Sequence, residues 1–229
     1  MQTTRVQITV KIDGNDYVCT PEEKILDVAK RCGIDIPTLC YNPLFTSDQR
    51  VGVCRVCVVE VIAGGKSGLQ SSCTLPVSTG LVVSTRSEAV YSERRMILEL
   101  LLSEHLFDCW HCDISGNCNF AKLCRDYDLD GVPVCAECFN KNESCLLQQG
   151  ILCLGPITQM GCRAYCTNLG DACYGCYHMI TNESVLKSNI YIFKDRKIAA
   201  KNIIEAAQIF SFDSLSLLRK VLKEEGYNE

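Results

Sequence analysis

The chain has 229 residues, a formal net charge of −4 and 18 cysteines. An acidic chain with thinly spread basic residues lacks the positive patch of a nucleic-acid-binding protein, so no DNA or RNA partner is expected. Its longest apolar runs, such as residues 100–102, are far shorter than the roughly 20 residues of a membrane span, so no membrane span is expected. The opening Met-Gln-Thr-Thr-Arg lacks the features of a signal peptide. This predicts a cytoplasmic protein whose cysteines bind metal or carry out redox chemistry instead of forming disulfides.

Residues 1–86 are expected to form a small α+β domain. Apolar residues alternate from residue 6 to 12 and again at 17 and 19, which predicts two strands around a turn. Thr20 and Pro21 predict the start of a helix, and Gly33 predicts its end. Two further strands are expected at 56–62 and 81–85, around a turn at 63–68. The Gly-Lys-Ser within that turn is not expected to bind a nucleotide, because Glu60 stands where a phosphate loop requires glycine.

The remaining chain is expected to form three further parts. Residues 87–130 begin with a clear helix at 87–104, and residues 131–181 are rich in cysteine, glycine and asparagine with little periodicity. A segment of this kind is expected to fold around what it binds. Residues 182–229 contain no cysteine and predict short amphipathic helices at 198–209 and 214–225, which indicates a helical docking tail.

A first set of candidate ligands comprises Cys40, Cys54, Cys57 and Cys73. One close pair combined with two distant single cysteines is typical of plant-type [2Fe–2S] ferredoxins. A zinc knuckle more often shows two close pairs. The spacing therefore favours a [2Fe–2S] cluster and leaves structural zinc as the alternative.

A second set follows the helix at 87–104 and comprises His105, Cys109, Cys112 and Cys118. By ligand count alone, three cysteines and a histidine fit a zinc site as well as an iron–sulfur cluster. His111 lies inside the set but not at a ligand position. We expect it to face solvent or to lie beside the site without binding metal.

The stretch from Ile36 through Cys118 resembles the N-terminal region of the large iron–sulfur subunit of respiratory complex I and the diaphorase subunit of NAD-reducing hydrogenases. Matching segments occur in order around both sets of ligands, at 36–40, 54–60, 72–77, 80–85 and 94–102. The resemblance implies a β-grasp ferredoxin domain that holds a [2Fe–2S] cluster at the first set. It also implies a small helical domain that holds a [4Fe–4S] cluster at the second set.

Eight further cysteines depart from that family, which normally continues with two C-x2-C-x2-C-x3-C-P runs. They are Cys135, Cys138, Cys145, Cys153, Cys162, Cys166, Cys173 and Cys176. Their segment resembles the C-terminal cluster-binding segment of cytoplasmic [NiFe]-hydrogenase small subunits. The resemblance implies one [4Fe–4S] cluster at the first four and another at the last four. The flavodoxin-like domain that precedes this segment in such subunits has no counterpart here, so direct contact with a nickel–iron site is not expected.

Three cysteines, Cys19, Cys32 and Cys124, fit no set and are expected to be ordinary buried residues. Arg50, Arg55 and Arg125 lie near candidate ligands in the sequence, and we expect them to be solvated surface charges, with electrostatic tuning of the cluster potentials as the alternative. The four sets together predict one [2Fe–2S] and three [4Fe–4S] clusters.

The sequence shows no catalytic acid–base pair, nucleophile or dinucleotide motif, so no catalytic residue is assigned. The resemblance implies a subunit of a hetero-oligomer that relays electrons between an NADH-oxidising flavin subunit and a terminal redox enzyme, with a hydrogenase suggested. A flavin-based bifurcating, transhydrogenase-like, formate-oxidising or aldehyde-oxidising complex is the alternative within this class. A scaffold protein that binds structural zinc is the alternative outside it.

Overall fold

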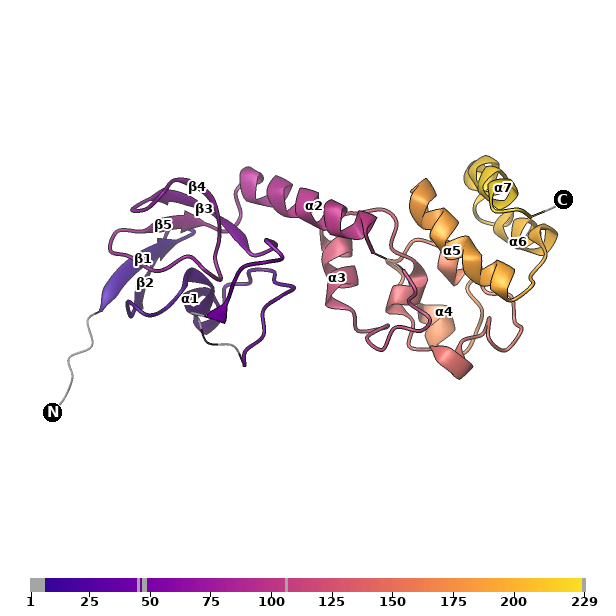
Figure 1. Cartoon of the computed structure of the whole chain (residues 1–229), viewed down its shortest axis with the longest axis horizontal. Coiled ribbons are helices and arrows are strands. Elements are labelled where there is room, and N and C mark those ends of the chain that lie inside the picture. The colour runs from indigo at the N-terminus through magenta and orange to yellow at the C-terminus, as the bar shows by residue number, and fades with distance from the viewer. Residues whose placement is uncertain (1–6, 45, 47–48, 106, 228–229) are drawn as a thin grey trace. The chain divides into compact units, whose positions relative to one another are not determined.

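The N-terminal part of the chain folds as a mixed five-stranded sheet with a helix packed against it (Figure 1). The computed structural model describes residues 7–44, 46, 49–105 and 107–227. The strands are β1 (Ile8–Ile12), β2 (Asn15–Cys19), β3 (Val58–Ala63), β4 (Gly68–Ser71) and β5 (Val82–Ser84), in the sheet order β2-β1-β5-β3-β4. Strands β1 and β5 are parallel, and the other neighbouring pairs are antiparallel. The predicted α+β class is confirmed.

The core of this part lies between the sheet and helix α1 (Ile25–Arg31). Val10 and Ile12 of β1 are buried, as are Leu26 and Val28 of α1, and all four belong to one apolar cluster. Full burial of an aliphatic side chain contributes about 1.5–3 kcal/mol. The apolar residues whose alternation predicts β1 from the sequence therefore include those that face the core.

Helix α1 begins four residues later than the sequence predicts. The Glu23 carboxylate accepts a hydrogen bond from the Thr20 N–H (2.8 Å), so the residues after Thr20 form a turn. Lys24 is extended and pairs with Pro76, and Asp27 accepts a hydrogen bond from the Lys24 N–H (3.1 Å). The capping residues of the helix are therefore Lys24 and Asp27, and the predicted start at Thr20 is wrong.

Strand β4 is not predicted from the sequence, because its four residues include only one large apolar side chain, Leu69, which is 38% exposed at the edge of the sheet. The Gly-Lys-Ser segment at 65–67 belongs to the β3–β4 connection and is followed by this strand. A phosphate loop would lead into a helix. The segment is therefore a hairpin turn, as expected.

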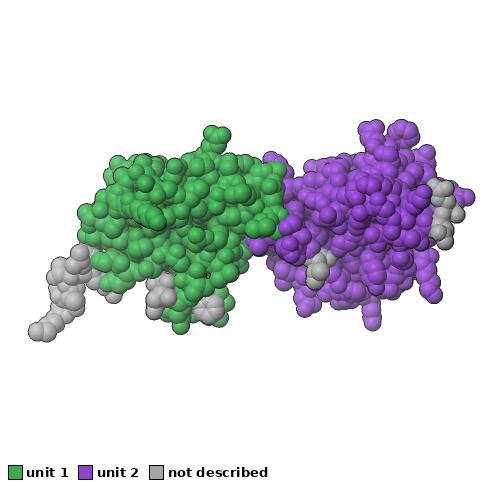
Figure 2. All heavy atoms as spheres, turned by 45° about the horizontal axis from the view of Figure 1, so that its top comes forward, with its two compact units in different colours: residues 1–100 green, residues 101–229 purple. Residues whose placement is uncertain are grey.

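Residue contacts divide the chain into two compact units, residues 1–100 and 101–229 (Figure 2). The division falls within helix α2 (Glu88–Ser103), which confirms the helix predicted at 87–104. In the first unit, buried Arg94 attaches α2 to the sheet by donating hydrogen bonds from Nε and Nη2 to the carbonyl oxygen of Val58 (3.1 and 2.7 Å). None of the helices in the described part of the chain is long and apolar enough to cross a bilayer.

The second unit consists of short helices joined by irregular segments (Figure 1). Its α-helices are α3 (Asn119–Asp126), α4 (Tyr165–Asn168), α5 (Glu183–Asp195), α6 (Ala200–Ala207) and α7 (Leu215–Glu224). Its 3-10 helices are η2 (Val134–Glu137), η3 (Asn142–Ser144), η4 (Gly155–Ile157) and η5 (Phe212–Ser214). Helices α6 and α7 confirm the two amphipathic helices predicted near the C-terminus.

Helix α5 is the principal element that the sequence does not reveal. Its Ile190-Tyr191-Ile192-Phe193 run is rich in β-branched and aromatic residues, which favour strands and obscure the helical period. Asn182 nevertheless caps the helix by accepting a hydrogen bond from the Val185 N–H (3.3 Å). Helix α5 contacts both α7 and η4, so residues 182–229 pack within the second unit.

Candidate metal centres

The first ligand set lies at the open end of the β3–β4 hairpin and on the loops beside it. Cys57 directly precedes β3, and Cys73 is the second residue after the end of β4. Ser72 connects the two, because its N–H and Oγ both donate hydrogen bonds to the Cys57 carbonyl oxygen (3.1 and 2.8 Å). The hairpin thereby brings together two cysteines that are 16 residues apart in the sequence.

All four cysteines of the first set line one cavity of about 240 Å³. A hydrogen bond between the sulfurs of Cys57 and Cys73 lowers the pKa of Cys57 to about 6 and raises the pKa of Cys73. Burial raises the pKa of Cys40, which also contacts Cys54. The structure therefore brings together four soft sulfur donors, the donor type that suits an iron–sulfur cluster.

The second set lies between the end of α2 and the start of α3. Cys118 is the N-cap of α3, and its Sγ accepts a hydrogen bond from the Ala121 N–H (3.5 Å). A helix N-terminus stabilises nearby negative charge. Burial, followed by the charges of Cys118 and Cys112, raises the pKa of Cys109 to about 12. These electrostatic interactions place the three cysteines near one another.

His105 follows α2 and stacks against Phe120, with ring centroids 5.2 Å apart. Partial burial lowers the pKa of His105, which favours the neutral imidazole that binds metals. Its position relative to the three cysteines stays a prediction. His111 is exposed, as expected, and its Nδ1 lies 3.0 Å from a carboxylate oxygen of Asp108.

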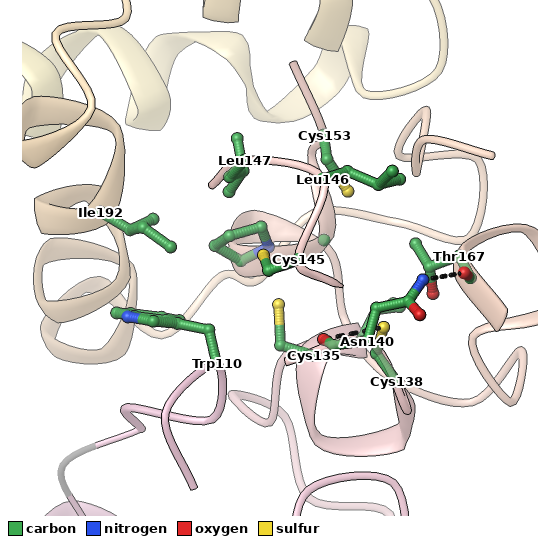
Figure 3. A pocket seen from close by; sticks show the side chains of 13 residues that line it. Trp110, Cys135, Cys138, Asn140, Cys145, Leu146, Leu147, Cys153, Thr167 and Ile192 are labelled. Atoms are coloured by element: carbon green, nitrogen blue, oxygen red, sulfur yellow. Dashed lines mark hydrogen bonds between the residues drawn. The ribbon is translucent and has the colours of Figure 1, made fainter. Parts of the chain in front are cut away.

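The third set, Cys135, Cys138, Cys145 and Cys153, also lines one cavity, which Figure 3 shows from close by. Trp110 and Ile192 of α5 close it on one side. The free volume is only about 20 Å³. A [4Fe–4S] core is larger, so its insertion would move the cysteine side chains apart.

Backbone donors reach the third set as well. The Cys173 N–H donates a hydrogen bond to Cys153 Sγ (3.3 Å), and the Gly155 backbone lowers the pKa of the same thiol. Burial is the larger effect and raises the pKa of Cys153 to about 12. Burial also raises the pKa of Cys135 well above its ordinary value. Such thiols stay protonated unless a cationic partner offsets the cost of burying their charge, and iron is such a partner.

The fourth set, Cys162, Cys166, Cys173 and Cys176, lines a separate cavity of about 530 Å³. Tyr165, Tyr174 and Tyr177 contribute to its wall. Val134 and Thr167 line both this cavity and that of the third set. The eight cysteines thus gather into the two groups of four that the resemblance implies, and their role as ligands stays a prediction.

The second, third and fourth sets lie in sequence within the second unit. Cys109 of the second set interacts electrostatically with Cys135 of the third. Trp110, which follows Cys109 in the sequence, lines the third cavity. Gly155 lies between the third and fourth sets, because a Cβ built on it would be 3.3 Å from Cys135 Sγ and 3.9 Å from Cys173 Cβ.

The three cysteines outside the ligand sets differ from one another in exposure, and so do the three arginines near the candidate ligands. Cys19 and Cys124 are buried as expected, whereas Cys32 is partly exposed. Arg55 is exposed and Arg125 is partly exposed, with Nη1 2.7 Å from a carboxylate oxygen of Glu137. Arg50 differs from the expectation, because its side chain is only 11% exposed.

Across the residues described, no three His, Cys, Asp or Glu side chains are placed to hold a metal ion by themselves.

Comparison with known protein families assigns the first part of the chain. Residues 5–88 match the 2Fe-2S iron-sulfur cluster binding domain. Residues 94–133 match the NADH-ubiquinone oxidoreductase-G iron-sulfur binding region. The first match contains all four cysteines of the first set, and the second contains His105, Cys109, Cys112 and Cys118.

Individual relatives agree with this assignment. The chain is 42% identical over 128 residues to the NADP-reducing hydrogenase subunit HndD of Solidesulfovibrio fructosivorans, covering 55% of this chain and 22% of that protein. It is 38% identical over 117 residues to the NADPH-Fe(3+) oxidoreductase subunit alpha of Geobacter sulfurreducens, covering 51% of this chain and 13% of that protein. It is 33% identical over 124 residues to the mitochondrial NADH-ubiquinone oxidoreductase 78 kDa subunit of Candida albicans, covering 54% and 16%.

Among solved structures, a crystal structure of the NAD+-reducing [NiFe]-hydrogenase in the H2-reduced state matches with 33% identity and a TM-score of 0.47, covering 53% of this chain and 49% of that chain. The chain spans between about an eighth and a fifth of the length of the curated relatives named above. Residues 5–88 are therefore similar to a [2Fe–2S] cluster-binding domain, and residues 94–133 are similar to the iron–sulfur binding region of NADH-ubiquinone oxidoreductase-G.

Proposed function

We propose that this chain is a non-catalytic iron–sulfur subunit that relays electrons within an NAD(P)H-linked oxidoreductase complex. One observation carries the proposal beyond the matched residues 5–133. The eight cysteines from Cys135 to Cys176 gather into two groups of four around two cavities that share Val134 and Thr167. Two four-cysteine sites next to a matched iron–sulfur region are what an electron relay requires.

The proposed ligands are the four sets described above, with one [2Fe–2S] cluster at the first set and [4Fe–4S] clusters at the other three. Clusters of these types supply one-electron transfer when they are bound. The chain's own residues bury some of these cysteines, Cys109 and Cys153 among them, and direct backbone N–H groups to the sulfurs of Cys118 and Cys153. These donors stabilise negative charge on the sulfurs, which makes reduction of a bound cluster more favourable.

The proposed partners are an NADH-oxidising flavin subunit on one side and a terminal redox enzyme on the other, in a cytoplasmic hetero-oligomer. The names of the relatives favour NADH or NADPH as the source or destination of electrons. The relative from Solidesulfovibrio fructosivorans favours a hydrogenase as the terminal enzyme. The NADPH-Fe(3+) oxidoreductase subunit favours the second candidate, a complex with a different terminal acceptor.

The proposal is tested by metal analysis of the whole chain after anaerobic purification. One [2Fe–2S] and three [4Fe–4S] clusters predict about 14 irons and about 14 acid-labile sulfides per chain, with visible absorption that dithionite bleaches. Electron paramagnetic resonance (EPR) at several temperatures would separate the [2Fe–2S] signal from the [4Fe–4S] signals. A colourless protein that contains zinc would overturn the proposal. An iron content of about 6 per chain would overturn the assignment of two clusters to the segment after residue 133.

The terminal enzyme is identified by isolating the chain from its native cells with its associated proteins. A hydrogenase large subunit among them supports the first candidate. A flavoprotein or a formate- or aldehyde-oxidising enzyme in its place supports the second.

A further inference from the structure

Arg50 forms part of the wall of the first cavity, together with Cys40, Cys54, Cys57 and Cys73. Its side chain is 11% exposed, and its Nη1 lies 2.5 Å from Oδ1 of Asp27 on α1. The guanidinium carbon is 4.9 Å from the centroid of the Tyr41 ring, which is within the range of a cation–π contact. A fixed positive charge therefore borders the cavity that the four sulfurs surround.

The Nε atom of Arg50 is buried and has no hydrogen-bond partner among the residues that the structure describes. A guanidinium carries five N–H donors, and leaving one of them buried and unpaired is costly. Nη1 is paired with Asp27, whereas the Nε–H has no acceptor among the described residues. The cavity beside it contains sulfurs, which accept hydrogen bonds well when they carry negative charge.

A second cation lies in the same region. Lys30 Nζ is 3.4 Å from the centroid of the Tyr41 ring, and its pKa is lowered by burial and then by the charge of Arg50. Two cations this close repel each other, and the carboxylates of Asp27 and Asp35 oppose that repulsion. Of these two cations, Arg50 is the one that lines the cavity, so it is placed to interact with an anionic group there.

We propose that Arg50 is a positioning residue that raises the reduction potential of the [2Fe–2S] centre at the first set. The proposal rests on the cluster assignment made under the proposed function. Reduction transfers one electron from a one-electron donor to the centre, adds one negative charge and breaks no bond. The fixed guanidinium, with its Nε–H available to a sulfur, stabilises that added charge.

The decisive experiment compares Arg50→Gln with Asp27→Asn in the full-length, cluster-loaded chain. The midpoint potential is measured by EPR-monitored titration with dithionite and mediators at constant pH and salt. Removing the cation is expected to lower the equilibrium constant for one-electron reduction about tenfold, which corresponds to ~59 mV. Removing the anion with Asp27→Asn is expected to shift the potential in the opposite direction.

Arg55→Gln is the matched control, because it removes the same charge from an exposed residue beside Cys54. Water screens that charge, so its shift is expected to be much smaller than that of Arg50→Gln. Equal shifts for the two arginine variants, or no shift for Arg50→Gln, would overturn the role of Arg50.

Arg50→Lys covers the case in which Arg50→Gln fails to retain iron at the first set. It keeps the charge and removes the Nε–H, so it is expected to retain the cluster with a smaller decrease in potential. In that case, the proposal is overturned if the midpoint potential of Asp27→Asn is not higher than that of the wild-type chain. A wild-type chain without a [2Fe–2S] signal would instead refute the proposed function itself, so the two failures are distinguishable.

Discussion

Cys118 and Cys124 lie six residues apart on one helix, yet their surroundings differ. Cys118 caps α3 and accepts the Ala121 N–H, whereas Cys124 is 0% exposed and burial raises its pKa to about 12. We predict that Cys118→Ala removes about four irons per chain, because it deletes a proposed ligand of the second set. Cys124→Ala is expected to keep all the iron and to lower the free energy of unfolding by about 1 kcal/mol, the cost of a small cavity.

Iron and sulfide analysis of the two purified variants tests this prediction, and chemical denaturation of Cys124→Ala measures its stability. Both substitutions remove a single thiol from the same short helix, so each is a control for the other. Equal iron loss in the two variants would show that Cys124 belongs to the ligand set. Full iron content in Cys118→Ala would remove Cys118 from it.

At the residue scale, the sequence is most informative where chemistry fixes the spacing. The Cys54-x2-Cys57 pair and the single Cys40 and Cys73 are recognisable because a cluster needs its ligands on tight loops. Arg50 is not recognisable in this way. Its burial depends on Asp27, 23 residues earlier, and on the Tyr41 ring, and no local pattern encodes that contact.

At the element scale, the short helix η4 is placed so that its first residue approaches two ligands of the third set. A Cβ on Gly155 would be 3.3 Å from Cys135 Sγ and 3.6 Å from Cys153 Sγ. The 3.3 Å separation is shorter than an ordinary contact, so the Cys135 sulfur would have to shift. We predict that Gly155→Ala reduces cluster occupancy at the third set and leaves the first set intact.

The measurement is EPR of Gly155→Ala, comparing the [4Fe–4S] signals with the [2Fe–2S] signal of the same sample. Gly150→Ala is a suitable comparison, because a Cβ there meets no atom within 4 Å, although its positive φ of 79° adds some backbone strain. An unchanged [4Fe–4S] signal in Gly155→Ala would mean that the space around η4 adapts. A loss confined to the [2Fe–2S] signal would contradict the placement of η4 beside the third set.

The elements that can be predicted are those with a clear period and standard ends. The alternation in β1, the long helix α2 and the amphipathic helices α6 and α7 are evident from the sequence. The start of α1 is not, because the Thr20–Glu23 hydrogen bond forms a turn from residues that also suit a helix start. Helix α5 is not evident from the sequence because it contains residues that favour strands. Its packing against η4 and α7 stabilises these residues in a helix.

At the scale of the whole molecule, the two units differ in what holds them together. The first has its own sheet and apolar cluster, which includes Val10, Val59 and Val83. The second has short helices around cysteine-lined cavities, and bound metal can supply part of its folding free energy. The sequence indicates this contrast through the loss of periodicity after residue 104. It does not indicate that residues 182–229 pack with the cysteine-rich segment, because that packing depends on α5.

The contrast predicts that iron divides unequally between the units and that the first unit holds its share alone. Residues 1–100 contain the complete sheet, its core and all four cysteines of the first set. A chain ending at Leu100 is therefore expected to fold and to bind about two irons, with the spectrum of a [2Fe–2S] centre. The measurement is iron content together with EPR, and Cys73→Ala in the same shortened chain is the control that should lose the signal. If the shortened chain folds, as judged by circular dichroism, but binds no iron, the first centre depends on residues beyond 100.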